Sequence, residues 1–501
     1  MIGNESTESC FDNSGLLQSV TMDDMSEPTS RSVPNVIFIT LDQFRGDSLS
    51  CAGHPVVKTP NLDRLAASGV RLANHYSQAA PCAPGRAALY TGTYQMNNRV
   101  VANGTPLDNR FYNIARLARR SGYEPTLFGY TDQSIDPREV ADPEDPRLRT
   151  YEGILPGFSS GLDLTGNQDP WLEWLNGLGY AIPDAIAAWI SEDARPSEHS
   201  ESAFLTNAVL DWLPRQTSPW FAHLSYLRPH PPYVAAGHYA TMYDPDDCPP
   251  AVASADVRHR LHDRLLDHRE FAAGKRRHSV LEIRAQYYGM ISEVDAQLGR
   301  IVDHLQANDS WDDTIIMVTS DHGEQLGDQG LIGKAGFFES SYHVLGIVRD
   351  PRFVHAHGRV VDQFTENVDF FPTLCESLGV EVPIQCDGLP LTPFLRGEAP
   401  QVWRNAVFYE WDWRDAFLRG PKRDWPWDQR LERQHLTVRR SHTHAYVQFG
   451  DGSYLCFALQ VDPTWRTEEQ DPGRILEQAQ EMLVWRSRHA ERTLTDVLLG
   501  A

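Results

Sequence analysis

The sequence predicts an α/β fold, with a large, mainly parallel β-sheet between helices and a small α+β domain at the C-terminus. Continuous apolar runs at 36–41 and 314–319 are typical of strands buried on both faces of a parallel sheet. Helical patterns alternate with such runs, as in sheets whose two faces are covered by helices. From about residue 401, short strand-like segments replace this alternation.

The elements of the large sheet are predicted one by one along the chain. The first strand, Val36–Leu41, ends at Asp42, where the chain becomes polar. Thr59-Pro60-Asn61 is a helix start signal, and the apolar stripe that follows it ends at Gly69. The remaining predicted elements are a helix over 113–121, strands over 125–128 and 220–226, a long amphipathic helix over 282–306, and the strand 314–319.

Two irregular stretches, 133–200 and 235–280, are rich in Pro, Gly, Asp and Arg, and are predicted to form insertions or lids over the sheet. The C-terminal part is predicted to hold strands at 406–411, 443–449 and 453–459 and a helix over 474–494. The predicted organisation is therefore a loose leader, 1–33, a large α/β domain, 34–400, and a small C-terminal domain, 401–501.

Length and composition exclude several classes of protein. The 501 residues are 41% hydrophobic, which is enough for a large buried core and excludes a disordered chain. With 45 Lys+Arg against 68 Asp+Glu, the net charge of −23 argues against a nucleic-acid partner or an anionic membrane surface. An anionic substrate is not excluded, because a local cationic pocket can outweigh a distant acidic surface.

The seven cysteines are scattered, without a CxxC pair, so neither a disulfide scaffold nor a structural zinc site is expected. No apolar run reaches the length of about 18 residues that a membrane span needs. The N-terminus lacks the basic and apolar regions of a secretory signal. These features predict a protein of the reducing cytoplasm.

The strongest chemical signal is Pro81-Cys-Ala-Pro-Gly-Arg-Ala-Ala-Leu-Tyr-Thr-Gly92, which places Cys82-x-Pro84-x-Arg86 at the start of a predicted helix. Pro84 suits the first helical turn, where its missing N–H has no cost. The free N–H groups of a helix N-terminus favour a negative group on residue 82. Taken alone, the motif also fits an ordinary buried cysteine before a helix.

Cys82-x-Pro-x-Arg86 followed by Leu-x-Thr-Gly resembles the sulfatase signature of the alkaline phosphatase superfamily. Further blocks that match the family are Asn35–Gln43, Lys58–Leu65, Thr319–Asp328 and Val368–Leu374. The resemblance implies an alkaline-phosphatase-like fold for the large domain. It also implies that a separate formylglycine-generating enzyme converts Cys82 to formylglycine, whose aldehyde hydrate would be the nucleophile.

Within the superfamily, the closest resemblance is to phosphonate monoester hydrolases, which also cleave phosphodiesters. It rests on Gln43 after Asp42, on His322 after Asp321, and on the segments 103–107, 224–233 and 485–495. The resemblance implies a homotetramer in which C-terminal segments cross between subunits. The substrate implied is a small anionic ester.

A metal site is expected where predicted strands end. Asp42 and the pair Asp321-His322 each follow a buried strand, and the carboxyl ends of parallel strands meet at one edge of a sheet. Two carboxylates, one imidazole and an oxygen from residue 82 form a mixed donor set. Imidazole shifts the preference from Ca²⁺ towards Mn²⁺, Fe²⁺ or Zn²⁺, so we expect one divalent metal, with Mn²⁺ first. Gln43 is expected to bind this metal weakly or to orient a neighbour.

The implied reaction is substitution at phosphorus. The metal would polarise a phosphoryl oxygen, the formylglycine oxyanion would attack to give a covalent enzyme–ester, and Asp321 would accept the proton. Arg86 and Lys334 are candidates to stabilise the charge on the equatorial oxygens, and Arg86 alternatively positions residue 82 and its helix. Lys334 stands where the family places its active-site lysine. A surface lysine is the alternative.

The leaving group and the remaining substrate oxygens need further contacts. His230, in a proline-rich loop, is the candidate general acid, and a loop histidine that merely packs is the alternative. Asn103 and Tyr130 are candidates to donate hydrogen bonds to substrate oxygens. Asp132 stands where a hydroxyl residue is expected. It would bind a cationic group of the substrate, shift selectivity away from dianions, or point elsewhere.

Two departures from the family pattern bear on the substrate. Ordinary sulfatases carry Lys-x-His where this chain has Tyr130-Thr-Asp132, and the loss of both cations favours diesters and phosphonate monoesters over phosphate monoesters and sulfates. His343 replaces an expected arginine, which changes the local support of the site. The leading prediction is thus a phosphonate monoester hydrolase and phosphodiesterase. The alternatives are an arylsulfatase or promiscuous sulfate and phosphate ester hydrolase, and a non-catalytic binding member, which would have broken ligands.

Overall fold

The structure is a computed structural model. It describes residues 33–490 apart from 149, 151, 218, 277, 415 and 417–432. The predicted leader lies outside the described residues except for residue 33, and so do the last four residues of the predicted tail helix. Among the described residues, no helix combines the length and the apolar character needed to cross a membrane.

The large sheet has eight strands in the order β5-β4-β6-β1-β7-β8-β2-β9. Neighbouring strands are parallel, except that β8 is antiparallel to both β7 and β2. The strands are β1 Asn35–Leu41, β2 Val70–Tyr76, β4 Pro125–Gly129, β5 Ser159–Asp163, β6 Phe221–Tyr226, β7 Thr314–Thr319, β8 Gly346–Arg349 and β9 Arg359–Glu366. The predicted α/β class with a mainly parallel sheet is therefore confirmed.

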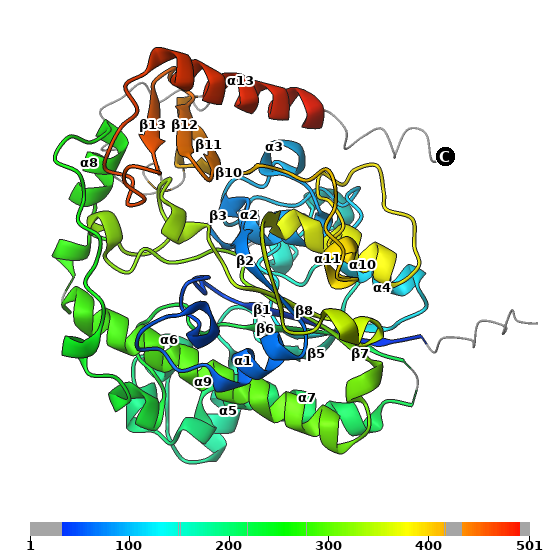
Figure 1. The fold of residues 1–501 in the computed structure, drawn as a ribbon. Coiled ribbons are helices and arrows are strands. Elements are labelled where there is room, and N and C mark those ends of the chain that lie inside the picture. The colour runs from blue at the N-terminus through cyan, green and yellow to red at the C-terminus, as the bar shows by residue number, and fades with distance from the viewer. Residues whose placement is uncertain are drawn as a thin grey trace, which may run out of the picture. The chain divides into compact units, whose positions relative to one another are not determined.

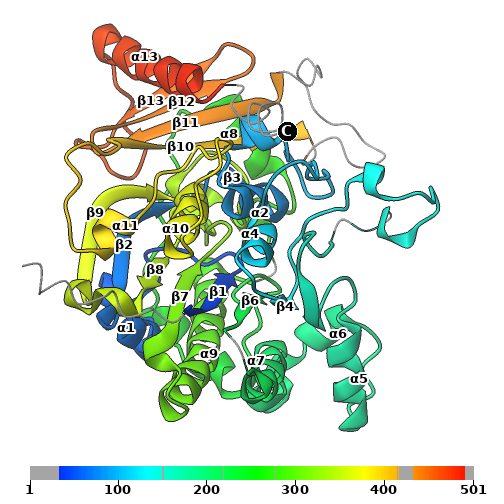
Figure 2. The ribbon, with the colours of Figure 1, turned by 90° about the vertical axis from the view of Figure 1, so that its right-hand side faces the viewer.

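Helices cover both faces of this sheet (Figures 1 and 2). Side chains of β1 alternate between two cores, with Ile37 and Ile39 in one and Val36 and Phe38 in the other. The first core is closed by α1 Pro60–Ala67, α7 Glu201–Trp212 and α9 Val280–Ala307. The second is closed by α2 Cys82–Thr91, α4 Ile114–Arg120, α10 Phe370–Ser377 and α11 Thr392–Leu395. Burial on both faces explains why β1 is a continuous apolar run.

A second, smaller sheet follows the large one. Its antiparallel strands are β10 Ala406–Asp412, β11 His435–Ser441, β12 His444–Phe449 and β13 Tyr454–Ala458. Helix α13, Pro472–His489, packs on it, and the ring of Trp485 stacks on Phe408 with centroids 4.4 Å apart. The fifth strand is β3, Ala79–Ala80, which pairs with β10. This small sheet is therefore joined by backbone hydrogen bonds to the segment just before Cys82.

The irregular stretches contain more regular structure than expected. The stretch 133–200 holds the edge strand β5 and the helices α5 Asp169–Gly177 and α6 Ala185–Trp189. The stretch 235–280 holds α8, Arg260–Asp267. Outside these stretches, the short helix α3, Gln95–Asn98, lies between α2 and α4. The boundary predicted at residue 400 stays a prediction.

Candidate active site

Four potential ligands meet at the carboxyl edge of the large sheet. Asp42 follows β1, and Asp321 and His322 follow β7, which pairs with β1 in parallel so that the two strand ends are side by side. Ligand atoms of these three residues and of Cys82 all lie within 4.8 Å of one another, and all four residues are buried. The convergence predicted from the strand ends is therefore present in the structure.

Cys82 enters this cluster from the N-terminus of α2. Its Sγ lies 3.3 Å from Nε2 of His322 and 4.0 Å from Oδ1 of Asp42. Gly85 makes this approach possible, because a Cβ at that position would lie 2.4 Å from the carbonyl oxygen of Asp321. Gly85 thus lets α2 pack against the backbone that carries the metal-ligand candidates.

His322 has the protonation state that a metal ligand needs. Its Nδ1 lies 3.0 Å from the carbonyl oxygen of Gly323, to which it can donate only as N–H. The lone pair is then on Nε2, which faces Cys82. Burial lowers the pKa of His322 to about 4, so the imidazole is neutral near neutrality. A backbone hydrogen bond that fixes the tautomer is the usual support of a histidine ligand.

The two carboxylates differ in how strongly their surroundings favour the charged form. Burial and the charge of Asp321 raise the pKa of Asp42. Burial opposes ionisation of Asp321 as well, but His322, Arg86 and Lys334 outweigh it and hold its pKa low. Two carboxylates and a neutral imidazole fit a divalent cation of the Mn²⁺, Fe²⁺ or Zn²⁺ type, and fit Ca²⁺ less well.

Addition of Mn²⁺ to metal-free protein is expected to raise the melting temperature, because binding to the folded state alone adds about 2.7 kcal/mol of stability at 100 times the Kd. Asp42→Asn should lose most of this shift. Asp132→Asn, which changes a buried carboxylate outside the ligand set, should keep it. Scanning calorimetry of the three proteins checks the prediction. Equal shifts for both variants would contradict the assignment of Asp42 as a ligand.

Arg86 lies completely buried between the carboxylates. Its Nη2 is 3.1 Å from Asp42 Oδ2 and its Nε is 3.0 Å from Asp321 Oδ2. Its Nη1 donates to Oγ of Ser225 at 2.7 Å and to the carbonyl oxygen of Tyr130 at 3.2 Å. Because these partners occupy the guanidinium, the geometry favours the positioning role over contact with the substrate.

Asp321 is similarly occupied. Its Oδ1 accepts from the backbone N–H of Gln43 and of His322, and its Oδ2 accepts from Arg86. A carboxylate with a low pKa and this many donors is a weak base. Its surroundings therefore favour the ligand role over the proton-accepting role.

Asp132 and Tyr130 both face inward. An Asp132 oxygen lies 3.4 Å from Nε of Arg86, and burial raises the pKa of Asp132 to about 8. The hydroxyl of Tyr130 donates to Asp42 Oδ2 at 2.8 Å. Asp132 thus points to Arg86, and the Tyr130 hydroxyl supports a candidate ligand. Asn103 Oδ1 accepts the backbone N–H of Ala83 at 3.0 Å, which ties it to the first turn of α2.

The ammonium group of Lys334 lies next to residue 82. Its Nζ lies 3.1 Å from Cys82 Sγ and 3.0 Å from Oε1 of Gln43. Burial alone would lower the pKa of Lys334, but Cys82, Asp42 and Asp321 outweigh burial and raise it. Gln43 has a left-handed backbone with φ of 68°, and its Nε2 donates to Glu324. The side chain of Gln43 thus links Lys334 to Glu324.

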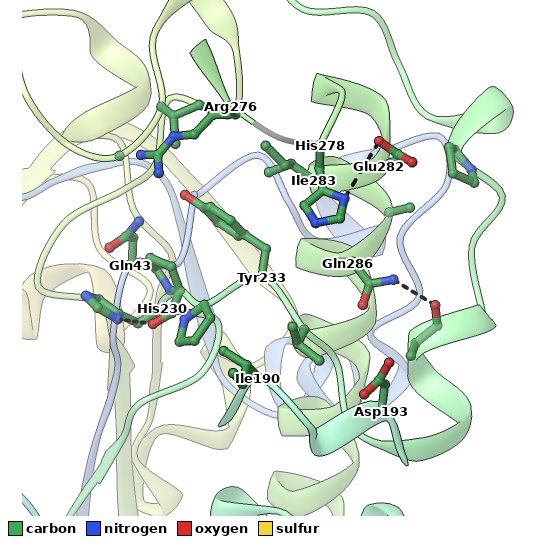
Figure 3. Close-up of a pocket in the computed structure, with 18 of the residues that line it drawn as sticks. Gln43, Ile190, Asp193, His230, Tyr233, Arg276, His278, Glu282, Ile283 and Gln286 are labelled. Atoms are coloured by element: carbon green, nitrogen blue, oxygen red, sulfur yellow. Dashed lines mark hydrogen bonds and ion pairs between the residues drawn. The ribbon is translucent and has the colours of Figure 1, made fainter. Parts of the chain in front are cut away.

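His230 lines a cavity that adjoins the ligand cluster. This cavity of about 1060 Å³ is lined by Gln43, His230, Tyr233 and Ile190 (Figure 3). Lys334, which contacts Gln43, also lines it. The Nδ1 of His230 lies 2.7 Å from the carbonyl oxygen of Pro231. Burial and the charge of Lys334 lower the pKa of His230. Residues of both irregular stretches line this cavity, namely Ile190, Asp193, Gly237, Ala240, Thr241, Tyr243, Pro245, Glu270, Phe271, Arg276 and His278. Their role as a lid stays a prediction.

The sequence analysis did not single out three residues that contact the site. Ser225, near the end of β6, bonds Arg86, and Glu324 bonds Gln43. Tyr233 lies along the cavity (Figure 3), and burial and the nearby charge of Glu324 raise the pKa of its hydroxyl. Ser225 lies at a strand end beside β1, which was an available signal. His343 contacts the carbonyl oxygen of Ala73 at 2.9 Å and is not part of the ligand cluster.

Comparisons with known proteins agree with this geometry. The sequence profile of the Sulfatase family matches residues 34–380. The multifunctional alkaline phosphatase superfamily protein PehA of Trinickia caryophylli is 36% identical over 92% of this chain and 96% of its own. The choline-sulfatase of Rhizobium meliloti is 30% identical, over 73% of this chain and 72% of its own.

Two solved structures are similar over nearly their whole length. The phosphonate monoester hydrolase of Agrobacterium radiobacter is 41% identical, with a TM-score of 0.84, and the match covers 92% of this chain and 97% of that one. The phosphonate monoester hydrolase of Silicibacter pomeroyi is 36% identical, with a TM-score of 0.80 and the same coverage. The small C-terminal sheet is included in this shared fold.

Proposed function

We propose that this chain, which belongs to the sulfatase family of hydrolases, cleaves phosphonate monoesters and phosphodiesters with a formylglycine made from Cys82 and one divalent cation, Mn²⁺ first. The observation that carries the proposal is the buried Asp42–Cys82–Asp321–His322 cluster, which adjoins the wide cavity through Lys334 and His230. The likeness to two phosphonate monoester hydrolases supports the substrate class. The intact ligand set argues against a non-catalytic binding member.

The family implies two groups, a formylglycine at residue 82 and a divalent cation. The first would supply the nucleophile and the second would activate the ester. A divalent cation would polarise the phosphoryl oxygen, and the formylglycine hydrate would supply the attacking hydroxyl. Asp42, Asp321 and His322 would hold the cation, with Gln43 at its side. Arg86 keeps the two carboxylates in place, as its hydrogen bonds to both show. Lys334 is placed to bind an anionic oxygen of the ester and to offset its charge.

His230 is proposed to protonate the leaving oxygen. Because its Nδ1–H is bonded to the carbonyl of Pro231, Nε2 is the nitrogen that can exchange a proton with the substrate. Burial and Lys334 hold the pKa of this imidazole low in the free protein. An anionic ester bound against Lys334 would cancel part of that effect and raise the pKa into the range of a general acid.

Charge bears on part of the substrate choice. With Arg86 occupied by carboxylates, Lys334 is the cation beside Cys82 among the described residues of the site. Such a site suits an ester with one negative charge better than a dianionic phosphate monoester. The number of cations in the site does not distinguish phosphodiesters from sulfate esters, because both carry one negative charge. The loss of the Lys-x-His cations therefore does not exclude sulfate esters. Sulfate ester hydrolysis is therefore the second candidate, and the choline-sulfatase relative supports it.

Metal-loaded, formylglycine-containing enzyme is expected to hydrolyse a 4-nitrophenyl phosphonate and a bis-4-nitrophenyl phosphodiester with the highest kcat/KM. The 4-nitrophenyl phosphate monoester should be slower by about tenfold or more, which is about 1.4 kcal/mol. A 4-nitrophenyl sulfate measured in the same buffer completes the comparison. The highest kcat/KM for the sulfate would replace the proposal by the arylsulfatase alternative. No hydrolysis of any of them would favour the non-catalytic alternative.

The proposal includes a formylglycine-generating enzyme as a partner during maturation. A homotetramer, a cytoplasmic location and the lack of a nucleic-acid partner stay predictions from the sequence.

A further inference from the structure

The loop that carries His230 is held from inside by one arginine. Arg228 follows β6 and is only 2% exposed. Its Nη1 donates to the carbonyl oxygen of His230 at 2.9 Å and to that of Pro232 at 3.0 Å. A single guanidinium therefore fixes the backbone of the turn at the histidine itself and two residues later. One guanidinium nitrogen thus holds both carbonyls and leaves the other, Nη2, free for a further partner, which the single nitrogen of the shorter lysine side chain cannot do.

The other side of this guanidinium faces a carboxylate from a distant segment. Nη2 of Arg228 forms an ion pair with Oε2 of Glu192, which is 1% exposed and belongs to the short 3-10 helix Glu192–Ala194. Oε1 of Glu192 accepts the backbone N–H of Glu201 at 3.2 Å, at the first residue of α7. A buried ion pair adds little net stability of its own, so we interpret this pair through the geometry that it fixes.

Two further buried carboxyl groups lie nearby but do not bond the loop. Burial raises the pKa of Glu201 to about 8 and that of Glu293 to about 7. Glu201 accepts from Nε1 of Trp189 at 3.2 Å, and Glu293 accepts from Oγ of Ser200 at 2.7 Å. Glu192 is the carboxylate in direct contact with Arg228.

The segment that supplies Glu192 also forms part of the cavity wall. Ile190 and Asp193 line the cavity on either side of Glu192 in the sequence, and His230 lines the same cavity (Figure 3). A group that fills the cavity would therefore touch the segment that anchors Arg228.

We propose that Arg228 and Glu192 are positioning residues, which hold His230 where it can protonate the leaving oxygen. The proposal rests on the proposed function, because it takes His230 as the general acid. The pair bonds the backbone of the loop and makes no contact with the ligand cluster in the hydrogen bonds and ion pairs of the described residues. Its loss should therefore weaken protonation of the leaving group and leave metal binding unchanged.

The test compares Glu192→Gln with Glu201→Gln in the full-length, metal-loaded enzyme. Glu192→Gln keeps the shape of the side chain and leaves the charge of Arg228 uncompensated, so the fork should move away from the two carbonyls. Its kcat/KM should fall by about 10–100-fold for aryl phosphodiesters with poor leaving groups, which reaches the lower end of the roughly 10²–10⁴-fold that a general acid contributes. The loss should be at most a few-fold for the 4-nitrophenyl diester. Glu201→Gln, a buried carboxyl outside the loop contacts, should stay within about threefold of the wild type throughout.

A second variant covers the case in which Glu192→Gln folds poorly. Arg228→Lys keeps the charge but has one nitrogen, on a shorter side chain, for Glu192 and the two carbonyls together, and it should show the same dependence on the leaving group. His230→Gln sets the reference. Suppose that His230→Gln loses more activity for substrates with poor leaving groups than for those with good ones. If Glu192→Gln and Arg228→Lys then lose activity equally for all substrates, the positioning role is wrong. If His230→Gln itself loses activity equally, the general acid of the proposed function is wrong.

Hydrogen exchange gives a readout that needs no turnover. The amide of His230 donates to the carbonyl oxygen of Leu227 at 2.9 Å, and that of Val234 donates to Pro232 at 2.8 Å. Both amides should exchange faster in Glu192→Gln than in the wild type or in Glu201→Gln. Unchanged exchange of this loop in Glu192→Gln would overturn the proposal, whatever the substrate preference of the enzyme.

Discussion

Cys82→Ala is expected to lower kcat/KM for the preferred ester by about four orders of magnitude or more, as removal of a nucleophile usually does. The candidate ligands and the Nζ of Lys334 converge on this one side chain. Burial and the charge of Asp42 raise the pKa of the Cys82 thiol, so the unmodified cysteine is a neutral, poor nucleophile. Conversion to formylglycine removes this obstacle, because a hydrated aldehyde brings an oxygen in place of the thiol.

The measurement combines steady-state kinetics with mass spectrometry of the peptide that contains residue 82. Active wild-type protein should show an aldehyde in place of the CH2–SH group at that position, with the loss of the sulfur and of two hydrogens and the gain of one oxygen. Cys51→Ala, which removes another free thiol outside the ligand cluster, is the control and should keep activity within a few-fold. Active protein that carries only unmodified Cys82 would contradict the proposed nucleophile. A Cys82→Ala enzyme whose kcat/KM stays within tenfold of that of the wild type would contradict it as well.

The central part of the fold could be predicted because burial on both faces leaves a clear sequence pattern. β1 and β7 are continuous apolar runs, and α9 has a long apolar stripe with a capping box at Ser279. β2 was not predicted, because its buried face includes His75. That imidazole bonds Thr365 and Asn367 inside the protein. A polar residue satisfied by distant partners cannot be told from a surface residue in a single sequence.

Two other strands, β8 and β11, were missed for a different reason. β8 is only four residues long, Gly346–Arg349, and is defined by antiparallel pairing with β7 and β2. β11, His435–Ser441, carries two arginines, and one of them, Arg439, is buried against Gln478 of α13. In both cases tertiary pairing determines the strand, and local pattern does not reveal it.

Site residues whose role follows from their position at the end of a strand could be predicted from the sequence. The contacts of a side chain, which depend on its direction, could be predicted less well. The ends of β1 and β7 predict the convergence of Asp42, Asp321 and His322. The sequence does not show that the Tyr130 hydroxyl points at Asp42, or that Arg86 is enclosed by carboxylates. These outcomes depend on packing between elements far apart in the chain.

The support of the His230 loop could not be predicted at all. Arg228 and Glu192 are 36 residues apart, and Glu192 lies in a stretch without helical or strand periodicity. An arginine beside proline-rich residues is also a common surface pattern. The fold places the pair under the loop, and only the structure reveals that its partners are two backbone carbonyls.

Arg86→Met is expected to lower the free energy of unfolding by about 3–5 kcal/mol, which is typical when one partner of a buried ion pair is removed. Without the guanidinium, the charges of Asp42 and Asp321 face each other in a buried site, with Asp132 nearby. Activity should also be lost, because the two ligand candidates would no longer be held together. Urea denaturation of metal-free wild type and variant checks the stability difference.

A matched substitution separates this role from the loss of any buried arginine. Arg349 is also buried, lies 3.7 Å above the ring of Trp311, and bonds backbone carbonyls away from the ligand cluster. Arg349→Met should lower stability yet keep the kcat/KM of the folded enzyme. A saturating divalent cation should restore more stability to Arg86→Met than it adds to the wild type, because both cations neutralise the same carboxylates. If Arg86→Met kept wild-type stability and only raised KM, Arg86 would instead be a substrate-binding residue.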